Sequence, residues 1–133
     1  MWTRDQQYGA AIYKQIHDDV AGRDDDYRDA YGAMAHKLPV LVRSAGLAQA
    51  LAFVEARGRK EHQALLDHLA KVVLKGGSAT GEGLAIRSRD TTNLSEYVYL
   101  THEVMAALVW YKRFAQSVLD VDPSDAASAE VEP

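Results

Sequence analysis

The segment that decides the fold is KLPVLVRSAGLAQALAF, from Lys37 to Phe53. Its apolar residues recur at helical spacing on two faces, which predicts a helix that is buried on more than one side. One face holds Leu41, Ala45, Ala48 and Ala52, and the other holds Val40, Leu47, Leu51 and Val54. Arg43 is charged at any physiological pH, so it must reach solvent, pair with an acid or meet an anionic partner.

Around this segment the pattern predicts an all-α fold, a compact single-domain bundle of about five helices over residues 1–120. The expected helices span residues 4–21, the stretch after the Asp24–Asp26 run, and residues 39–57, 59–75 and 95–119. Thr3 and Gln6 form a capping-box pattern ahead of the first helix, and Gly58 is placed to end the third. We expect Pro39 to separate the second and third helices, because a proline pushes the preceding residue out of the helical region.

Two glycine-containing regions carry further expectations. Gly46 lies inside the expected third helix, where a missing side chain would permit close helix packing. The run GGSATGEG predicts a flexible connector, followed by at most one short helical turn. It lacks the lysine of a GxxxxGKS/T phosphate-binding loop and follows no predicted strand, so it does not indicate a nucleotide site.

Composition excludes several classes of protein. The chain has 133 residues, of which 47% are apolar and 26% charged, and no apolar run approaches the ~20 residues of a membrane span. The absence of cysteine excludes disulfides and thiolate metal sites. We therefore expect a cytoplasmic protein that makes no membrane contact.

Charge is segregated along the sequence although the net charge is only −4. The last fourteen residues, from Asp120, hold five acids and no base, and we expect the tail at 121–133 to be disordered. Without those acids, 15 basic residues stand against 14 acidic ones. The excess of base lies between Tyr31 and Leu119, where eleven basic residues face seven acids. This segregation favours one basic surface on the folded domain.

No catalytic or metal-binding pattern is visible. His62 and His68 are six residues apart on one expected helix and point to different faces, and no HExxH pattern is present. The serines and threonines have no histidine and acid at a readable spacing. We predict no catalytic residue, no metal site and no cofactor.

The candidate contact residues are basic side chains near helix ends and loops. Such residues can converge from different helices and hold a polyanion through its phosphates, without reading bases. The candidates for contact with RNA or with a neighbouring subunit are Arg43, Arg113, Lys112, Lys37, Arg57, Arg59, Lys60 and Lys75. Structural roles compete with this interpretation: Arg57 can stabilise a helix C-terminus, and Lys71 can pair with Asp67.

The Lys37–Phe53 segment, together with Tyr97, Thr101, Glu103 and the run WYKRFA from Trp110 to Ala115, resembles the small all-helical subunit of type III-B CRISPR-Cas effector complexes, the Cmr complexes. The resemblance runs from about Gln6 to Val118, with Ser44-Ala45 where that family often has Thr-Asn. It implies a non-catalytic subunit that stacks in the minor filament and contacts the guide and target RNA in antiviral defence. The implied partners are other Cmr subunits, including the repeated backbone subunit, and copies of itself.

Three alternatives stay open at this stage. The chain could be the small subunit of a related type III-A complex, against which the proline-arginine-glycine segment argues. It could be a helical scaffold that contacts only protein. The third alternative is a helical enzyme whose site assembles from scattered residues such as His102, Glu103 and Tyr111.

Overall fold

The computed structural model describes residues 1–124, which form six α-helices and no strand, so the all-α prediction is confirmed. Over these residues the helices are α1 (Arg4–Asp19), α2 (Asp25–Ala45), α3 (Leu47–Arg57), α4 (Lys60–Val73), α5 (Gly81–Asp90) and α6 (Leu94–Ser117). No helix among them has the length and hydropathy needed to cross a bilayer.

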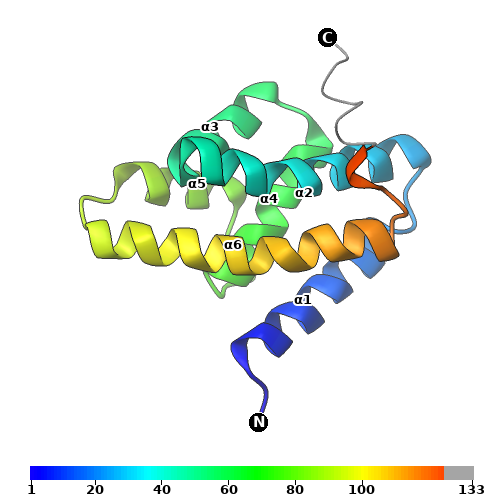
Figure 1. The fold of residues 1–133 in the computed structure, drawn as a ribbon, viewed down its shortest axis with the longest axis horizontal. Helices are drawn as coiled ribbons and strands as arrows, with labels where there is room; N and C mark the ends of the chain where they lie inside the picture. Colours follow the sequence, from blue (N-terminus) through cyan, green and yellow to red (C-terminus); the bar gives the residue numbers. More distant parts are fainter. Residues whose placement is uncertain (125–133) are drawn as a thin grey trace.

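The two longest helices, α2 and α6, lie side by side and run in opposite directions along the long axis of the molecule (Figure 1). α1 packs against α6 and α4. The shorter α3 packs on α2 and α4, and α5 packs on α4 and α3. The core between them contains the fully buried side chains of Ile12, Ile16, Tyr31, Leu38, Leu47, Leu51, Leu65, Leu66, Leu69, Leu84, Leu108 and Tyr111.

Local capping signals confirm two expected helix boundaries, and the second helix begins at Asp25, inside the acidic run, instead of after it. Thr3 and Gln6 form the predicted capping box at the start of α1, with the Thr3 side chain accepting from the Gln6 backbone N–H. The Asp24 carboxylate caps α2 by accepting from the Tyr27 N–H at 2.8 Å. Gly58 ends α3 in the left-handed conformation, with φ of 67°.

The expected break at Pro39 is wrong, and the break lies at Gly46. Pro39 is buried in the middle of α2, although a proline removes one helical hydrogen bond and costs about 3 kcal/mol in a helix interior. Packing of α2 along α6 offsets this cost. Gly46 has φ of 89°, which a residue with a side chain rarely adopts, and it joins the two helices by donating to the Val42 carbonyl and accepting from the Ala50 N–H.

This break also corrects the expected two-faced burial of the opening segment. Leu47, Leu51 and Val54 are buried in α3 as expected, but Val40 belongs to a separate helix and is 54% exposed. Ala45 and Ala52 are exposed as well. One helical register therefore does not run through the whole segment.

α5 forms where the sequence predicted a connector and at most one helical turn. Thr80 caps it by accepting from the Gly83 N–H at 3.0 Å. Asp67 of α4 accepts from the Gly81 N–H at 2.7 Å. A Cβ atom at Gly81 would lie 2.5 Å from Leu66 Cβ, so the glycine permits the close approach of the two helices. The helix thus depends on contacts with α4 that are distant in sequence.

The chain after α6 folds back onto α2. Leu119 and Val121 are 4% and 2% exposed. The carbonyl of Val121 accepts from His36 Nε2 at 2.7 Å, and its side chain covers Gly32 so closely that a Cβ there would lie 2.7 Å from Val121 Cγ2. Val121 is therefore part of the core, so the disorder predicted for residues 121–133 is wrong at this residue, and residues 125–133 fall outside the described residues.

Candidate nucleic-acid interface

Three of the predicted cations meet in one groove between α2 and α6. Arg43 lies on the last turn of α2, and Lys112 and Arg113 lie on the second half of α6. The groove has a volume of about 330 Å³ and is lined by Pro39, Arg43, Met105, Leu108, Val109, Lys112, Arg113 and Gln116. We call it the Arg43 groove.

The charges of the Arg43 groove are uncompensated. All three cations are exposed, and within residues 1–124 none of them makes a hydrogen bond or an ion pair. No acidic residue lines the groove. A cleft that carries charge of one sign next to an apolar floor attracts ligands of the opposite sign.

The helical repeat explains why these residues share one groove. On α6, Met105, Val109, Lys112 and Gln116 follow one another at intervals of three or four residues, which places them on one side of the helix. On α2, Pro39 and Arg43 are four residues apart and face the same neighbour. Because α2 and α6 are antiparallel, the two stripes form the opposing walls of the groove.

A second group of predicted cations gathers on another side of α2. Lys37 is six residues before Arg43, about 240° around the helix, and its Nζ lies 4.9 Å from the centre of the Phe53 ring. The Cζ atom of Arg57 lies 5.6 Å from the centre of the same ring, a cation–π contact. Arg57 is also in the last turn of α3. Arg59 pairs with Glu61, with 3.4 Å between Nε and Oε2.

Burial and the cations of this second group both lower the pKa of the nearby His62. Burial lowers the pKa of His62 to about 4, and the neighbouring Arg59 and Arg57 act in the same direction. Within residues 1–124, its Nδ1 atom is buried without a hydrogen-bond partner. Lys37 and Arg57 contact the Phe53 ring and Arg59 pairs with Glu61, whereas the three cations of the Arg43 groove make no such contact within residues 1–124.

Comparison with known proteins gives the family. The sequence model described as "CRISPR-associated protein (Cas_Cmr5)" matches residues 4–118. The chain belongs to the Cas_Cmr5 family. The chain is 44% identical over 120 residues to the CRISPR system Cmr subunit Cmr5 of Thermus thermophilus, and the match covers 90% of this chain and 99% of that protein.

A solved structure supports the same assignment. The X-ray crystal structure of a CRISPR-associated Cmr5 family protein from Thermus thermophilus matches with a TM-score of 0.75 and 44% identity. The match covers 89% of this Cas_Cmr5 family chain and 98% of the other. The resemblance inferred from the Lys37–Phe53 segment is therefore confirmed.

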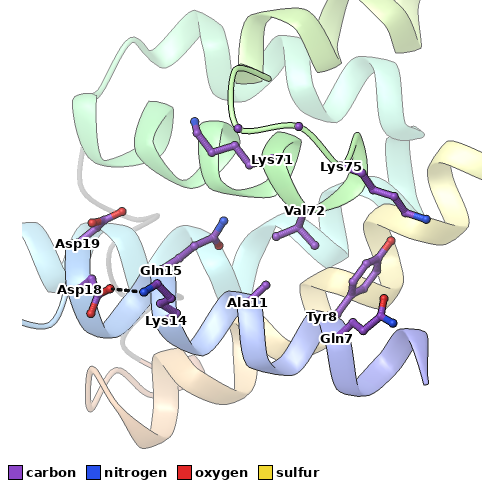
Figure 2. A pocket seen from close by; sticks show the side chains of 12 residues that line it. Gln7, Tyr8, Ala11, Lys14, Gln15, Asp18, Asp19, Lys71, Val72 and Lys75 are labelled. Atoms are coloured by element: carbon purple, nitrogen blue, oxygen red, sulfur yellow. Dashed lines mark ion pairs between the residues drawn. The ribbon is translucent and has the colours of Figure 1, made fainter. Parts of the chain in front are cut away.

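The last two predicted cations of this family member lie apart from both groups. Lys60 is exposed at the first position of α4. Lys75 lines a groove of about 610 Å³ between α1 and the end of α4, which Figure 2 shows from close by. This groove has mixed charge, because Asp18 and Asp19 also line it and Lys14 pairs with Asp18 at 3.7 Å.

The predicted alternative role of Lys71 is wrong. Instead of pairing with Asp67, Lys71 donates to the Ala79 carbonyl at 3.2 Å, while Asp67 accepts from Gly81. Both side chains therefore bind the segment that leads into α5.

The residues of the enzyme alternative form no joint site. Glu103 is buried and accepts from the Tyr8 hydroxyl at 2.6 Å, with Arg4 as its ion-pair partner. Tyr111 is fully buried and donates to Gln15 Oε1 at 2.6 Å, and His102 is exposed. No cluster of three or more histidines and acids suited to a metal occurs in the described part of the chain.

Sequence reasoning missed the apolar floor of the Arg43 groove. Met105 and Val109 precede Lys112 on α6 by seven and three residues, so their position on the same side could have been inferred from the helical repeat. That Pro39 lines the same groove could not have been inferred, because Pro39 was expected to separate two helices.

Proposed function

We propose that this protein is the small, non-catalytic subunit of a cytoplasmic type III-B (Cmr) CRISPR ribonucleoprotein, and that its Arg43 groove contacts the phosphate backbone of RNA. Family membership supports the first part, since a relative with 44% identity is a Cmr subunit of Thermus thermophilus. The observation that carries the second part is the grouping of three unpaired cations in a groove without an acid.

The chemistry of the groove fits a sequence-independent contact. Lysine and arginine on exposed helix turns reach phosphates, and the groove offers few groups that could read base edges. With three phosphate contacts, the slope of log affinity against log salt for single-stranded RNA would be about −2. Such a subunit binds weakly alone, and copies in a row would raise the affinity through effective concentration.

The proposed partners are the other Cmr subunits, including the repeated backbone subunit, copies of the chain itself in a filament, and the guide and target RNA. The match to a Cmr5 protein favours this assembly over a type III-A complex. The exposed apolar residues beside the cations, Val40 at 54% and Val109 at 48%, leave room for a protein contact next to the RNA contact.

The test is the affinity for single-stranded RNA of unrelated sequences, measured by fluorescence anisotropy at several salt concentrations. We expect the triple variant Arg43→Gln, Lys112→Gln, Arg113→Gln to lose both the affinity and most of the salt slope. The matched control is Lys60→Gln, Lys75→Gln, Arg89→Gln, which removes the same charge outside the groove.

Equal losses in the two triple variants would show that only overall charge matters and would contradict a specific groove. Unchanged RNA affinity in the groove variant, together with failure to co-purify with the Cmr complex, would favour the scaffold that contacts only protein.

A further inference from the structure

We propose that the acidic tail of this chain, residues 125–133, docks in the Arg43 groove and competes there with RNA. The tail, DAASAEVEP, holds Asp125, Glu130 and Glu132 and no base. The family match ends at residue 118, so the tail is a feature of this chain beyond the matched region. The docking is argued from the described residues of the groove and from the sequence of the tail, and its effect on RNA rests on the proposed function.

Val121, four residues before the tail, is fixed on the helix face that continues into the groove. Val121 packs on Gly32 and bonds to His36 of α2. Gly32, His36, Pro39 and Arg43 follow one another at intervals of four, three and four residues, so they lie on one face of α2. The attachment of Val121 and the Arg43 groove are therefore consecutive parts of the same helical face.

The α6 side of the groove leads to the same point. Gln116 lines the groove and α6 ends at the next residue, Ser117. The N–H of Val121 donates to the Ala115 carbonyl at 2.9 Å, which holds the returning chain against the end of α6 (Figure 1). Val121 thus contacts both helices that form the walls of the groove.

The length of the tail is sufficient. His36 and Arg43 are seven residues apart on α2, about 10 Å along the helix axis. Nine residues in extended conformation span about 30 Å, so the tail can reach the groove and continue past Lys112. A shorter tail of three or four residues would not bring its last acids to all three cations.

Charge and polarity of the tail match the groove. Three acids of the tail stand against three cations that have no partner among the described residues. Val131 lies between Glu130 and Glu132, an apolar side chain between two carboxylates. The groove has the complementary composition, since Met105 and Val109 form an apolar floor beside Lys112 and Arg113.

The consequence is a subunit that reduces its own affinity for stray polyanions. A tether of this length gives an effective concentration in the millimolar range. If the Kd of the tail for the groove is about one-quarter of that concentration, the groove is open about one-fifth of the time and binds RNA about fivefold more weakly than a groove without the tail. A long RNA held by several subunits displaces the tails, whereas a short one does not.

The experiment compares the full chain with the charge-neutral tail variant Asp125→Asn, Glu130→Gln, Glu132→Gln by ¹⁵N-resolved NMR. Docking predicts chemical-shift differences at Val109, Lys112, Arg113 and Arg43 that vanish at high salt. The variant Arg43→Gln, Lys112→Gln, Arg113→Gln should abolish the effect of the tail, whereas Lys60→Gln, Lys75→Gln, Arg89→Gln should preserve it. Differences confined to the neighbours of Ser124, or spread evenly over all lysines and arginines, would overturn the docking.

The affinity for a 30-nucleotide single-stranded RNA separates this proposal from the proposed function. We expect the charge-neutral tail to raise the affinity about fivefold at low salt. NMR docking without measurable RNA binding in either form would uphold the tail contact and refute the RNA contact. The charge-neutral tail is also combined with the groove variant Arg43→Gln, Lys112→Gln, Arg113→Gln. If neutralising the tail raises the RNA affinity equally in that variant, the effect is one of overall charge and competition at the groove is refuted.

Discussion

The hydroxyl of Tyr97 has a measurable role in holding α3, and the variant Tyr97→Phe tests it. α3 begins after Gly46, which has no side chain to cap the helix. The Tyr97 hydroxyl of α6 takes that place by accepting from the Ala48 N–H at 3.1 Å. The ring of a phenylalanine would preserve the packing of Tyr97, so the substitution removes only this hydrogen bond.

The size of the effect follows from the position of the bond. A cap at a helix N-terminus or a partly buried hydrogen bond contributes about 1 kcal/mol to the free energy of unfolding. At about 2.1 cal/mol/K of unfolding entropy per residue, a chain of this length loses about 4 °C in Tm for each 1 kcal/mol. We therefore expect Tyr97→Phe to lower the Tm by about 4 °C and to reduce the hydrogen-exchange protection of the Ala48 amide.

The matched control is Tyr13→Phe, because Tyr13 is 47% exposed and its hydroxyl makes no hydrogen bond within residues 1–124. Its free energy of unfolding should stay within about 0.5 kcal/mol of the parent protein. If urea denaturation gives the same value for the two variants, and the Ala48 amide keeps its protection, the hydroxyl does not cap α3 and the reasoning is refuted.

Two further predictions concern stability. Burial lowers the pKa of His62 to about 4 in the folded protein. As the pH falls below 6.5, the unfolded chain therefore binds a proton at His62 before the folded protein does. The free energy of unfolding should fall by about 2 kcal/mol as the pH decreases from 6.5 towards 4. His62→Leu should flatten this dependence in urea titrations at several pH values, His102→Gln should not, and a dependence that survives His62→Leu would reject the assignment. Gly32→Ala should cost about 1–3 kcal/mol because the new methyl group overlaps Val121, whereas Gly22→Ala, with open space around it, should change stability by less than about 0.5 kcal/mol. Equal denaturation midpoints for the two alanine variants would argue against close packing of Val121 on α2.

Helices whose signals are local were predictable from the sequence. The capping box at Thr3 and Gln6 and the stripe Tyr8, Ile12, Ile16 and Val20 act within a few residues, and all four residues of the stripe are buried. The same holds for α4, whose inward leucines and valines follow one face. Here the helical repeat alone determines which side packs inward.

Features that depend on distant contacts were not predictable. Pro39 stays helical because α2 packs along α6, and the left-handed break falls at Gly46, where Tyr97 supplies the missing cap. α5 forms because Asp67 of α4 accepts a hydrogen bond from its first residue, Gly81, and because Gly81 packs closely on Leu66. Local propensity favours another outcome in both cases, and tertiary packing overrides it.

The candidate site was predictable in its chemistry but not in its grouping. Arg43, Lys112 and Arg113 were candidates from charge and position, and they lie in one groove. The sequence could not show that Lys37 and Arg57 would cover Phe53 instead, because that contact joins α2 to α3 across the break. Which cations meet is decided by the antiparallel arrangement of α2 and α6.

The burial of Val121 bears on where this molecule can be shortened. A chain cut at residue 118, where the family match ends, would expose Gly32 and leave the buried ring of His36 without the carbonyl that accepts from Nε2. An unpaired polar group of this kind costs about 1–3 kcal/mol. The packed core therefore extends at least to Val121, and the family match, which ends at residue 118, understates the limits of the stable protein.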